Sequence, residues 1–463
     1  MTDSNVHSVS LRSPLTATAE RIFDWHKQPG AFERLVPPWS NVKVTRMDSG
    51  LAKGNRLYLK VKKGFLTFDW VAEIDDVVEG ARFSDTQIKG PFAYWHHEHR
   101  FQNATAGHCT IEDEVSYRVP GGFFGDALLD GFVCRDVDRL LAYRHSMLNN
   151  DLQAMLPFVD SPPQRVLISG TSGLIGAALI PFLQCAGHTV HRLVRSAPTS
   201  PTDVFWDPEK NVIQSEKLEK FDAIINLAGD NIASGRWTEA KKEKLRSSRV
   251  NSTDLLVSAC ANLTHPPKVF INASAIGFYG DRGNELVDES SSKGQGFLAD
   301  LAGQWEHATS KLTSTRVVLA RFGIVLSPKH GALKQMLTPF KFGLGGNLGN
   351  GEQFYSWIGI DDAVYSLYRA LMDERLTGPV NVVSPHPVTN AIFTKTLGRV
   401  LNRPTLIPMP EAIVRLAFGE MGDALLLSST RVQPKRLTDL LYPFAYADLE
   451  TCLRHLLGAT TPK

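Results

Sequence analysis

Three glycines at three-residue spacing follow an apolar run and open a helical pattern, and this feature restricts the fold more than any other. The segment after the run 166–169 reads Gly170, Thr171, Ser172, Gly173, Leu174, Ile175 and Gly176. Between a strand and a helix, such glycines permit a tight turn, a close approach of backbone to a pyrophosphate, and close helix–strand packing. The spacing is GxxGxxG rather than GxGxxG. We predict a dinucleotide-binding turn; a packing turn without a ligand is the alternative.

Apolar runs and helical patterns alternate from residue 164 onward. The runs cover residues 165–170, 188–195, 223–229, 268–275 and 316–326. Near-continuous apolar runs are typical of a parallel sheet covered on both faces by helices. We therefore predict the α/β class, with a Rossmann-type doubly wound sheet over 164–408 and a small helical domain over 409–463. The uncharged stretch 166–187 could span a membrane, but its glycines and Pro181 favour a strand, a turn and a buried helix.

The second apolar run of this domain ends without an acidic residue. An Asp or Glu about 20 residues after the glycine turn would bind the ribose hydroxyls of NAD. Here Arg192, Arg195 and Ser196 stand instead. An arginine at this place can form paired hydrogen bonds with a 2′-phosphate. We therefore predict that Arg195 and Ser196 select NADP(H) over NAD(H); a solvated arginine at a strand end is the alternative.

The first part of the chain has a different pattern. Short alternating runs cover 42–47, 56–63, 66–74, 94–101 and 109–119, and turn residues bound each run. This spacing predicts an antiparallel sheet. Helical patterns precede it at 18–26, with Thr16 or Thr18 as the cap, and follow it at 124–156. We predict an α+β domain over 1–156 and a proline-rich linker over 157–163.

Composition excludes several classes of protein. The 463 residues carry 50 Lys and Arg against 48 Asp and Glu, a net charge of +2, so the basic excess of a nucleic-acid-binding protein is missing. The five cysteines form no CxxC pair and favour a reducing compartment over a disulfide framework. The first residues lack an apolar signal segment. We expect a cytoplasmic protein without a membrane span.

From Arg165 to the end, the chain resembles the atypical short-chain dehydrogenase/reductase group known as epimerase-family, or nucleoside-diphosphate-sugar-epimerase-like, proteins. The resemblance rests on the segments 170–176, 226–232, 236–249, 274–280, 297–306 and 343–362, and the part from about Met409 is similar to the group's small C-terminal domain. It implies that Leu227, Ala228 and Gly229 pass the adenosine side of the cofactor. It also implies that Lys244 and Arg249 border a phosphate. A solvated helix face is the alternative for these last two. The glycine-rich segment 343–351 predicts a flexible, lid-like loop.

The sequence departs from the group's catalytic pattern. Ser274 matches the catalytic serine, but Leu298 and Ala302 stand where the tyrosine and lysine of YxxxK belong. Tyr279 is a tentative second catalytic residue, and packing is its alternative. Arg321 follows a buried strand at the carboxyl edge of the sheet and could bind a substrate phosphate or carboxylate. A structural ion pair is equally compatible with its position.

The first domain resembles the START/Bet v 1 helix-grip superfamily, also called polyketide-cyclase-like. The resemblance rests on the segments 94–101 and 111–120 and on the long helix to Leu152, and it implies a cavity for an apolar ligand. His97 and His99 share one face of a strand. Polar cavity contacts, sheet packing and two ligands of a zinc site all fit this pair. Because the sequence fixes no third ligand, we expect no bound metal.

Two functions from different classes fit these features. The first is an NADP(H)-dependent oxidoreductase or epimerase-like enzyme acting on a small organic substrate, with an accessory domain for a hydrophobic ligand. The second is an NADP(H)-binding sensor or scaffold with little or no catalysis. Some members of the resembled group carry a cell-division-inhibitor label, which suits the second function. The missing tyrosine and lysine keep both open.

Overall fold

The computed structural model describes residues 6–105 and 107–459, and the chain forms two compact units that divide after Val159. The first unit contains one antiparallel sheet in the order β1-β7-β6-β5-β4-β3-β2. Its strands are β1 (His7–Leu15), β2 (Asn41–Met47), β3 (Arg56–Lys63), β4 (Leu66–Val78), β5 (Arg82–Lys89), β6 (Tyr94–Thr105) and β7 (His108–Arg118). Its helices are α1 (Ala19–Lys27), α2 (Ala31–Leu35) and α3 (Gly122–Met155).

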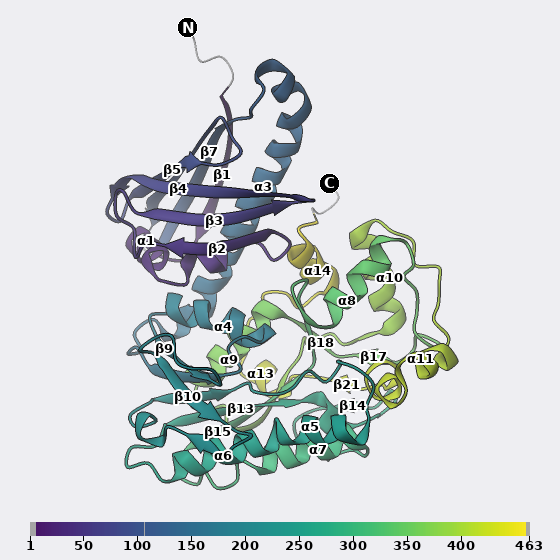
Figure 1. Ribbon diagram of the computed structural model, residues 1–463. Coiled ribbons are helices and arrows are strands. Elements are labelled where there is room, and N and C mark those ends of the chain that lie inside the picture. The colour runs from purple at the N-terminus through teal and green to yellow at the C-terminus, as the bar shows by residue number, and fades with distance from the viewer. Residues whose placement is uncertain (1–5, 106, 460–463) are drawn as a thin grey trace. The chain divides into compact units, whose positions relative to one another are not determined.

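One face of this sheet packs against the long helix α3 (Figure 1). Every second residue of β7 is buried, as expected for a strand with one face toward a core. Trp95, Val115 and Tyr117 of the sheet form a cluster with Val137 and Leu141 of α3. The fold class predicted for this part of the chain is therefore confirmed. The hydroxyl of Thr18 accepts a hydrogen bond from the N–H of Arg21, so Thr18 rather than Thr16 caps α1.

The second unit is built on an eight-stranded sheet in the order β11-β10-β9-β8-β12-β13-β15-β19. All its pairings are parallel except that of β10 with β11. The strand that follows β8 in the sequence, β9, lies on one side of it, and β12 lies on its other side. The position between β8 and β12 is therefore a topological switch point of the sheet. Ligands of such sheets bind at the carboxyl ends of the strands at this point. The Rossmann-type architecture is confirmed.

The strands of this sheet are β8 (Arg165–Ser169), β9 (Thr189–Val194), β10 (Asp203–Asp207), β11 (Val212–Ile213), β12 (Ala223–Asn226), β13 (Val269–Ala275), β15 (Arg316–Phe322) and β19 (Gly378–Val382). The short strands are β14 (Leu286–Val287), β16 (Ile324–Leu326), β17 (Phe354–Tyr355), β18 (Trp357–Gly359), β20 (Val388–Thr389) and β21 (Arg431–Val432).

The helices of the second unit lie between these strands in the sequence. They are α4 (Leu174–Cys185), α5 (Glu239–Ser247), α6 (Val250–Ala261), α7 (Phe297–His307), α8 (Gly331–Lys341), α9 (Ile360–Met372), α10 (Asn390–Leu401), α11 (Glu411–Phe418), α12 (Glu420–Gly422), α13 (Lys435–Asp439) and α14 (Leu449–Leu457). The uncharged stretch 166–187 therefore forms β8, the glycine turn and α4. Across the described ranges, no helix combines the length and hydrophobicity that a membrane crossing requires.

Candidate functional site

The glycine turn connects β8 to α4 at the switch point of the sheet. Gly170 has a φ of +69°, and a Cβ added there would lie 2.5 Å from the carbonyl oxygen of Leu227. A Cβ on Gly176 would lie 2.5 Å from the carbonyl oxygen of Gly170. Both positions therefore need glycine on steric grounds alone. Ser172 and Gly173 are exposed where α4 begins, so the turn presents backbone N–H groups that can receive a pyrophosphate.

A buried polar network lies beneath this turn, and the sequence interpretation missed it. The hydroxyl of Ser169, at the end of β8, donates to Oδ1 of Asn226 at 2.6 Å and accepts the N–H groups of Leu227 and Ala228 at 3.1 Å. Nδ2 of Asn226 donates to Thr253 and to Asn272, each at 2.8 Å. The network fixes the chain around 227–229 against the glycine turn. Its signal in the sequence is a polar residue after a run of three apolar residues in each of three strands.

Arg195 and Ser196 lie immediately after β9, and both are exposed. Arg192, three residues earlier, instead forms an ion pair with the buried carboxylate of Asp203 at 2.8 Å. Among the residues that the structure describes, Arg195 makes no ion pair or hydrogen bond. It is therefore the arginine at this strand end that remains available to an anion.

Lys244 and Arg249 converge on the loop that follows β12, although they lie five residues apart. Nζ of Lys244 is 3.9 Å from the carboxylate of Asp230, and Nη2 of Arg249 donates to the carbonyl oxygen of Asp230 at 3.0 Å. The guanidinium of Arg249 also packs 3.3 Å from where a Cβ on Gly229 would stand, and it lies over the ring of Trp305. Burial lowers the pKa of Arg249 to about 10, and the group remains a cation at neutral pH. Two cations therefore flank the 227–229 segment.

Ser274, Tyr279 and Arg321 belong to a second buried network, centred on Glu306 of α7. Ser274 Oγ donates to Glu306 Oε1 at 2.6 Å. Arg321 holds both oxygens of Glu306 at 2.8 Å and donates to the hydroxyl of Tyr279 at 3.0 Å. That hydroxyl donates in turn to Asn381 at 2.7 Å. The sequence analysis named Ser274, Tyr279 and Arg321 separately; Glu306 joins Ser274 to Arg321, and Arg321 in turn contacts Tyr279.

The geometry favours the structural alternatives for Arg321 and Tyr279. All three guanidinium nitrogens of Arg321 are hydrogen-bonded, and the residue is only 4% exposed. It therefore matches a structural ion pair and not an open substrate contact. Tyr279 has no exposed surface, and burial raises the pKa of its phenol, so the protonated form is favoured. Ser274 is also buried, but its hydroxyl donates to the carboxylate of Glu306, which can accept its proton.

The first unit contains a cavity of about 1180 Å³, partly open to solvent, between its sheet and its helices. Most of the lining is apolar and includes Phe32, Leu59, Trp70, Phe92 and Leu140. Asp85, His97, His99 and Arg144 bring polar atoms to the same cavity. Ligand sites of this size are typically apolar with a few convergent polar groups.

The fold and the turn at its switch point define a Rossmann-type dinucleotide-binding class of domain, joined to a helix-grip domain. Residues 166–383 match the NAD dependent epimerase/dehydratase family. Residues 15–143 match the polyketide cyclase/dehydrase and lipid transport family, and residues 409–456 match a domain family of unknown function, DUF1731. The chain belongs to the epimerase family, and the resemblances found in the sequence are confirmed.

Relatives of known structure and sequence support this assignment. An epimerase family protein of Mycobacterium bovis is 46% identical over 274 residues, which cover 59% of this chain and 90% of the relative. A nucleoside-diphosphate sugar epimerase from Corynebacterium glutamicum is 32% identical, with a TM-score of 0.79 over 97% of this chain and 90% of the other. The human epimerase family protein SDR39U1, solved with NADPH, is 35% identical, with a TM-score of 0.60 over 63% of this chain and 99% of the other.

Proposed function

We propose that the second unit binds NADP(H) and that the protein is an epimerase-like oxidoreductase acting on a small organic substrate. The observation that carries the proposal is the glycine turn at the β8–β12 switch point. At Gly170 and Gly176 of this turn, neighbouring backbone leaves no room for a side chain. Residues 170–176 would hold the pyrophosphate, and Leu227, Ala228 and Gly229 would border the adenosine side. The NADPH in the human relative supports the choice of cofactor.

Cations at two positions fit the charge of this cofactor. Arg195 and Ser196 would bind the 2′-phosphate, because no carboxylate lies at the end of β9 to repel it. Lys244 and Arg249 would border a phosphate beside the loop after β12. When bound, the nicotinamide supplies or accepts a hydride.

The test is a comparison of NADPH and NADH binding by the purified full chain. Native mass spectrometry of undialysed protein should show the retained mass of NADP(H). Calorimetric titration should then give an affinity for NADPH at least about tenfold higher than for NADH, a difference of about 1.4 kcal/mol. Equal affinities would contradict the roles of Arg195 and Ser196. No binding of either nucleotide would overturn the proposal.

Ser274 is the residue that we propose for proton transfer. Its hydroxyl can relay the proton of a substrate hydroxyl to Glu306, whose carboxylate Arg321 holds in place. Ser274→Ala should abolish any turnover found with a candidate substrate and leave NADPH binding unchanged. Turnover that survives this substitution would remove Ser274 from the mechanism.

The second candidate function, an NADP(H)-binding sensor or scaffold, is favoured by one observation. Leu298 and the buried Ala302 occupy the positions of the tyrosine and lysine, and neither can transfer a proton. This function predicts NADPH binding without turnover of any small organic substrate tested. Hydride transfer from bound NADPH to such a substrate would exclude it.

The first unit would serve as the accessory binding domain for a hydrophobic ligand. Its cavity of about 1180 Å³ is large enough for a ligand of drug-like size, and apolar side chains dominate the lining. An apolar fluorescent probe should bind the full chain with one site and be displaced by long-chain hydrophobic compounds. Leu59→Arg, which places a charge on the cavity wall, should prevent this binding.

A further inference from the structure

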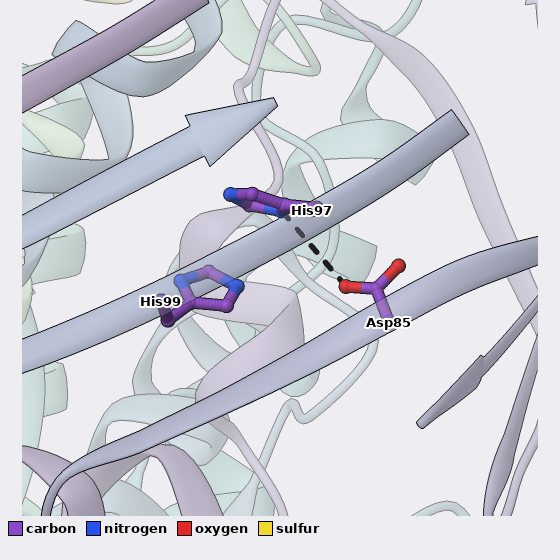
Figure 2. A group of neighbouring side chains, drawn as sticks. All are labelled: Asp85, His97 and His99. Carbon is purple, nitrogen blue, oxygen red and sulfur yellow. Dashed lines mark ion pairs between the residues drawn. The ribbon is translucent and has the colours of Figure 1, made fainter. Parts of the chain in front are cut away.

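Three side chains of the first unit meet at the wall of its cavity because of the strand register. Asp85 of β5 lies directly opposite His97 of β6. His97 and His99 are alternate residues of β6 and share the inner face of the sheet. One ligand atom from each of Asp85, His97 and His99 can be chosen so that all three atoms lie within 4.8 Å of one another (Figure 2). The third side chain that the sequence did not fix is therefore Asp85.

The hydrogen bonds of His99 leave one of its nitrogens available to this group. Its Nδ1 lies 2.8 Å from Oδ1 of Asp113, which is 2% exposed and stands opposite His99 on β7. A proton on Nδ1 is held by that carboxylate, so Nε2 keeps its lone pair. A carboxylate behind a histidine is the usual support of a metal-binding imidazole, because it fixes the ring and its tautomer.

The side chains of His97 and Asp85 form no hydrogen bond to another described residue. Nδ1 of His97 is 3.9 Å from Oδ2 of Asp85, and its Nε2 is 3.7 Å from Oδ2 of Asp113. Both distances are longer than a hydrogen bond. Yet His97 is only 3% exposed, and Nε2 has no hydrogen-bond partner in the described part of the chain. A buried imidazole without a hydrogen bond is costly, and a bound ion would remove that cost.

The charge of the surroundings favours a cation over an anion. Asp85 brings one carboxylate to the group and Asp113 lies behind His99 with a second, whereas Arg144 of α3 lies near both but forms no ion pair with a described residue. Burial lowers the pKa of His97 and of His99 and so disfavours the imidazolium form of each ring. The imidazole of His26 lies beside that of His99, and Nε2 of His145 is 3.3 Å from Asp113.

We propose that Asp85, His97 and His99 bind a divalent first-row transition-metal ion such as Zn²⁺ at the wall of the apolar cavity. Two imidazole nitrogens and one carboxylate oxygen are ligands that such ions prefer. Metal–ligand distances are about 2.0–2.2 Å, so side-chain shifts of about 1 Å would complete the site. The three ligands leave coordination positions open toward the cavity, where an oxygen of a bound ligand can enter.

The test uses the full chain, freed of metal by chelation and without an affinity tag. Titration with Co²⁺ should give one equivalent of bound metal and absorption bands in the visible region, and Zn²⁺ should displace them. His97→Gln and His99→Gln should each lose these bands over the range that saturates the unmodified protein. His96→Gln is the matched control, because His96 directly precedes His97 on the same strand and points to the opposite face of the sheet, and it should retain them.

Two further variants address folding and positioning. Asp85→Asn changes no volume and should also abolish the bands, while circular dichroism and NADPH binding stay unchanged. Asp113→Asn should weaken Co²⁺ binding by about 10- to 100-fold, as expected for loss of the residue that orients His99. The proposal is overturned if the unmodified protein takes up no Co²⁺, or if the His97, His99 and Asp85 variants bind it as tightly as the unmodified protein. It does not depend on the NADP(H) proposal.

Discussion

Two arginines at one strand end show how neighbouring residues of the same type acquire different roles. Arg192 lies within β9 and is held by Asp203, which also accepts N–H groups of Thr199 and Ser200. Arg195 follows the strand and stays exposed. The sequence shows that both are present, but only the position of Asp203 on the adjacent β10 separates a structural arginine from an available one.

Arg195→Ala should lower the affinity for NADPH by about 10- to 100-fold, because hydrogen bonds to a charged phosphate contribute about 1.5–3 kcal/mol. The affinity for NADH should stay the same, since NADH carries no 2′-phosphate. Calorimetric titration of both nucleotides measures the difference. Arg46→Ala, on the first unit, is the control for a lost surface cation. An equal loss for both nucleotides would contradict a role in 2′-phosphate recognition.

His188 should make the second unit sensitive to acid. Its Nδ1 accepts the N–H of Gln164 at 3.0 Å, and burial lowers its pKa to about 4. The unfolded histidine has a pKa of about 6.5, so the stabilising contribution is complete above that pH and is lost as the pH falls toward 4.

Between pH 6.5 and pH 4, His188 should lower the free energy of unfolding by at most about 1.4 kcal/mol per pH unit. His188→Asn keeps an acceptor near the Nδ1 position without titrating. Denaturant unfolding at a series of pH values should therefore show a shallower loss of stability in the variant. Identical slopes in the two proteins would contradict the prediction.

At the scale of single elements, the turn between β8 and α4 depends on Gly170 for two reasons: its left-handed backbone conformation and its close approach to the backbone of Leu227. The two effects can be separated by experiment. Gly170 and Gly187 both have positive φ, but only at Gly170 would a Cβ meet backbone. Gly187→Ala should cost about 1–2 kcal/mol of stability from the left-handed conformation and leave NADPH binding intact. Gly170→Ala should cost more and abolish NADPH binding. Equal effects on binding would show that the close approach to Leu227 is unimportant.

The sequence predicted five of the seven strands of the first unit and missed β1 and β5; in the main sheet of the second unit it missed β10, β11 and β19. β1 and β5 are rich in Ser, Arg, Asp, Thr and Gln, so their alternation is weak, and only pairing with β7, β4 and β6 defines them. The glycine-rich segment 343–351, which the sequence predicted to be a flexible loop, is held by hydrogen bonds to other segments. Leu348 donates its N–H to Asn390, and Gly349 donates to the carbonyl of Met409. Its glycines therefore belong to a hydrogen-bonded segment.

The candidate site was predictable only in part, for a physical reason. The glycine turn has a local sequence signature, because its constraints act within seven residues. The Ser274–Glu306–Arg321–Tyr279 network joins residues up to 47 positions apart on separate elements. Such pairings depend on strand order and helix placement, and spacing along the chain does not contain them.

At the scale of the whole molecule, the two units should respond to different ligands. Each has its own core, and the two proposed sites lie in separate units. NADPH at about 100 times its dissociation constant should stabilise the second unit by about 2.7 kcal/mol, and an apolar ligand should stabilise the first. Differential scanning calorimetry should show two transitions, each shifted by one ligand. A single transition shifted by both would contradict this independence.

The polar network beneath the glycine turn has a consequence for how the sheet opens. Ser169, Asn226 and Asn272 belong to three adjacent strands, and Trp305 of α7 joins them through Thr253. If one strand leaves, the others retain buried amides and hydroxyls without partners, each at a cost of about 1–3 kcal/mol. Fraying of a single central strand is therefore suppressed. Amide hydrogens of β8, β12 and β13 should exchange with solvent together, at the slow rate of a cooperative opening.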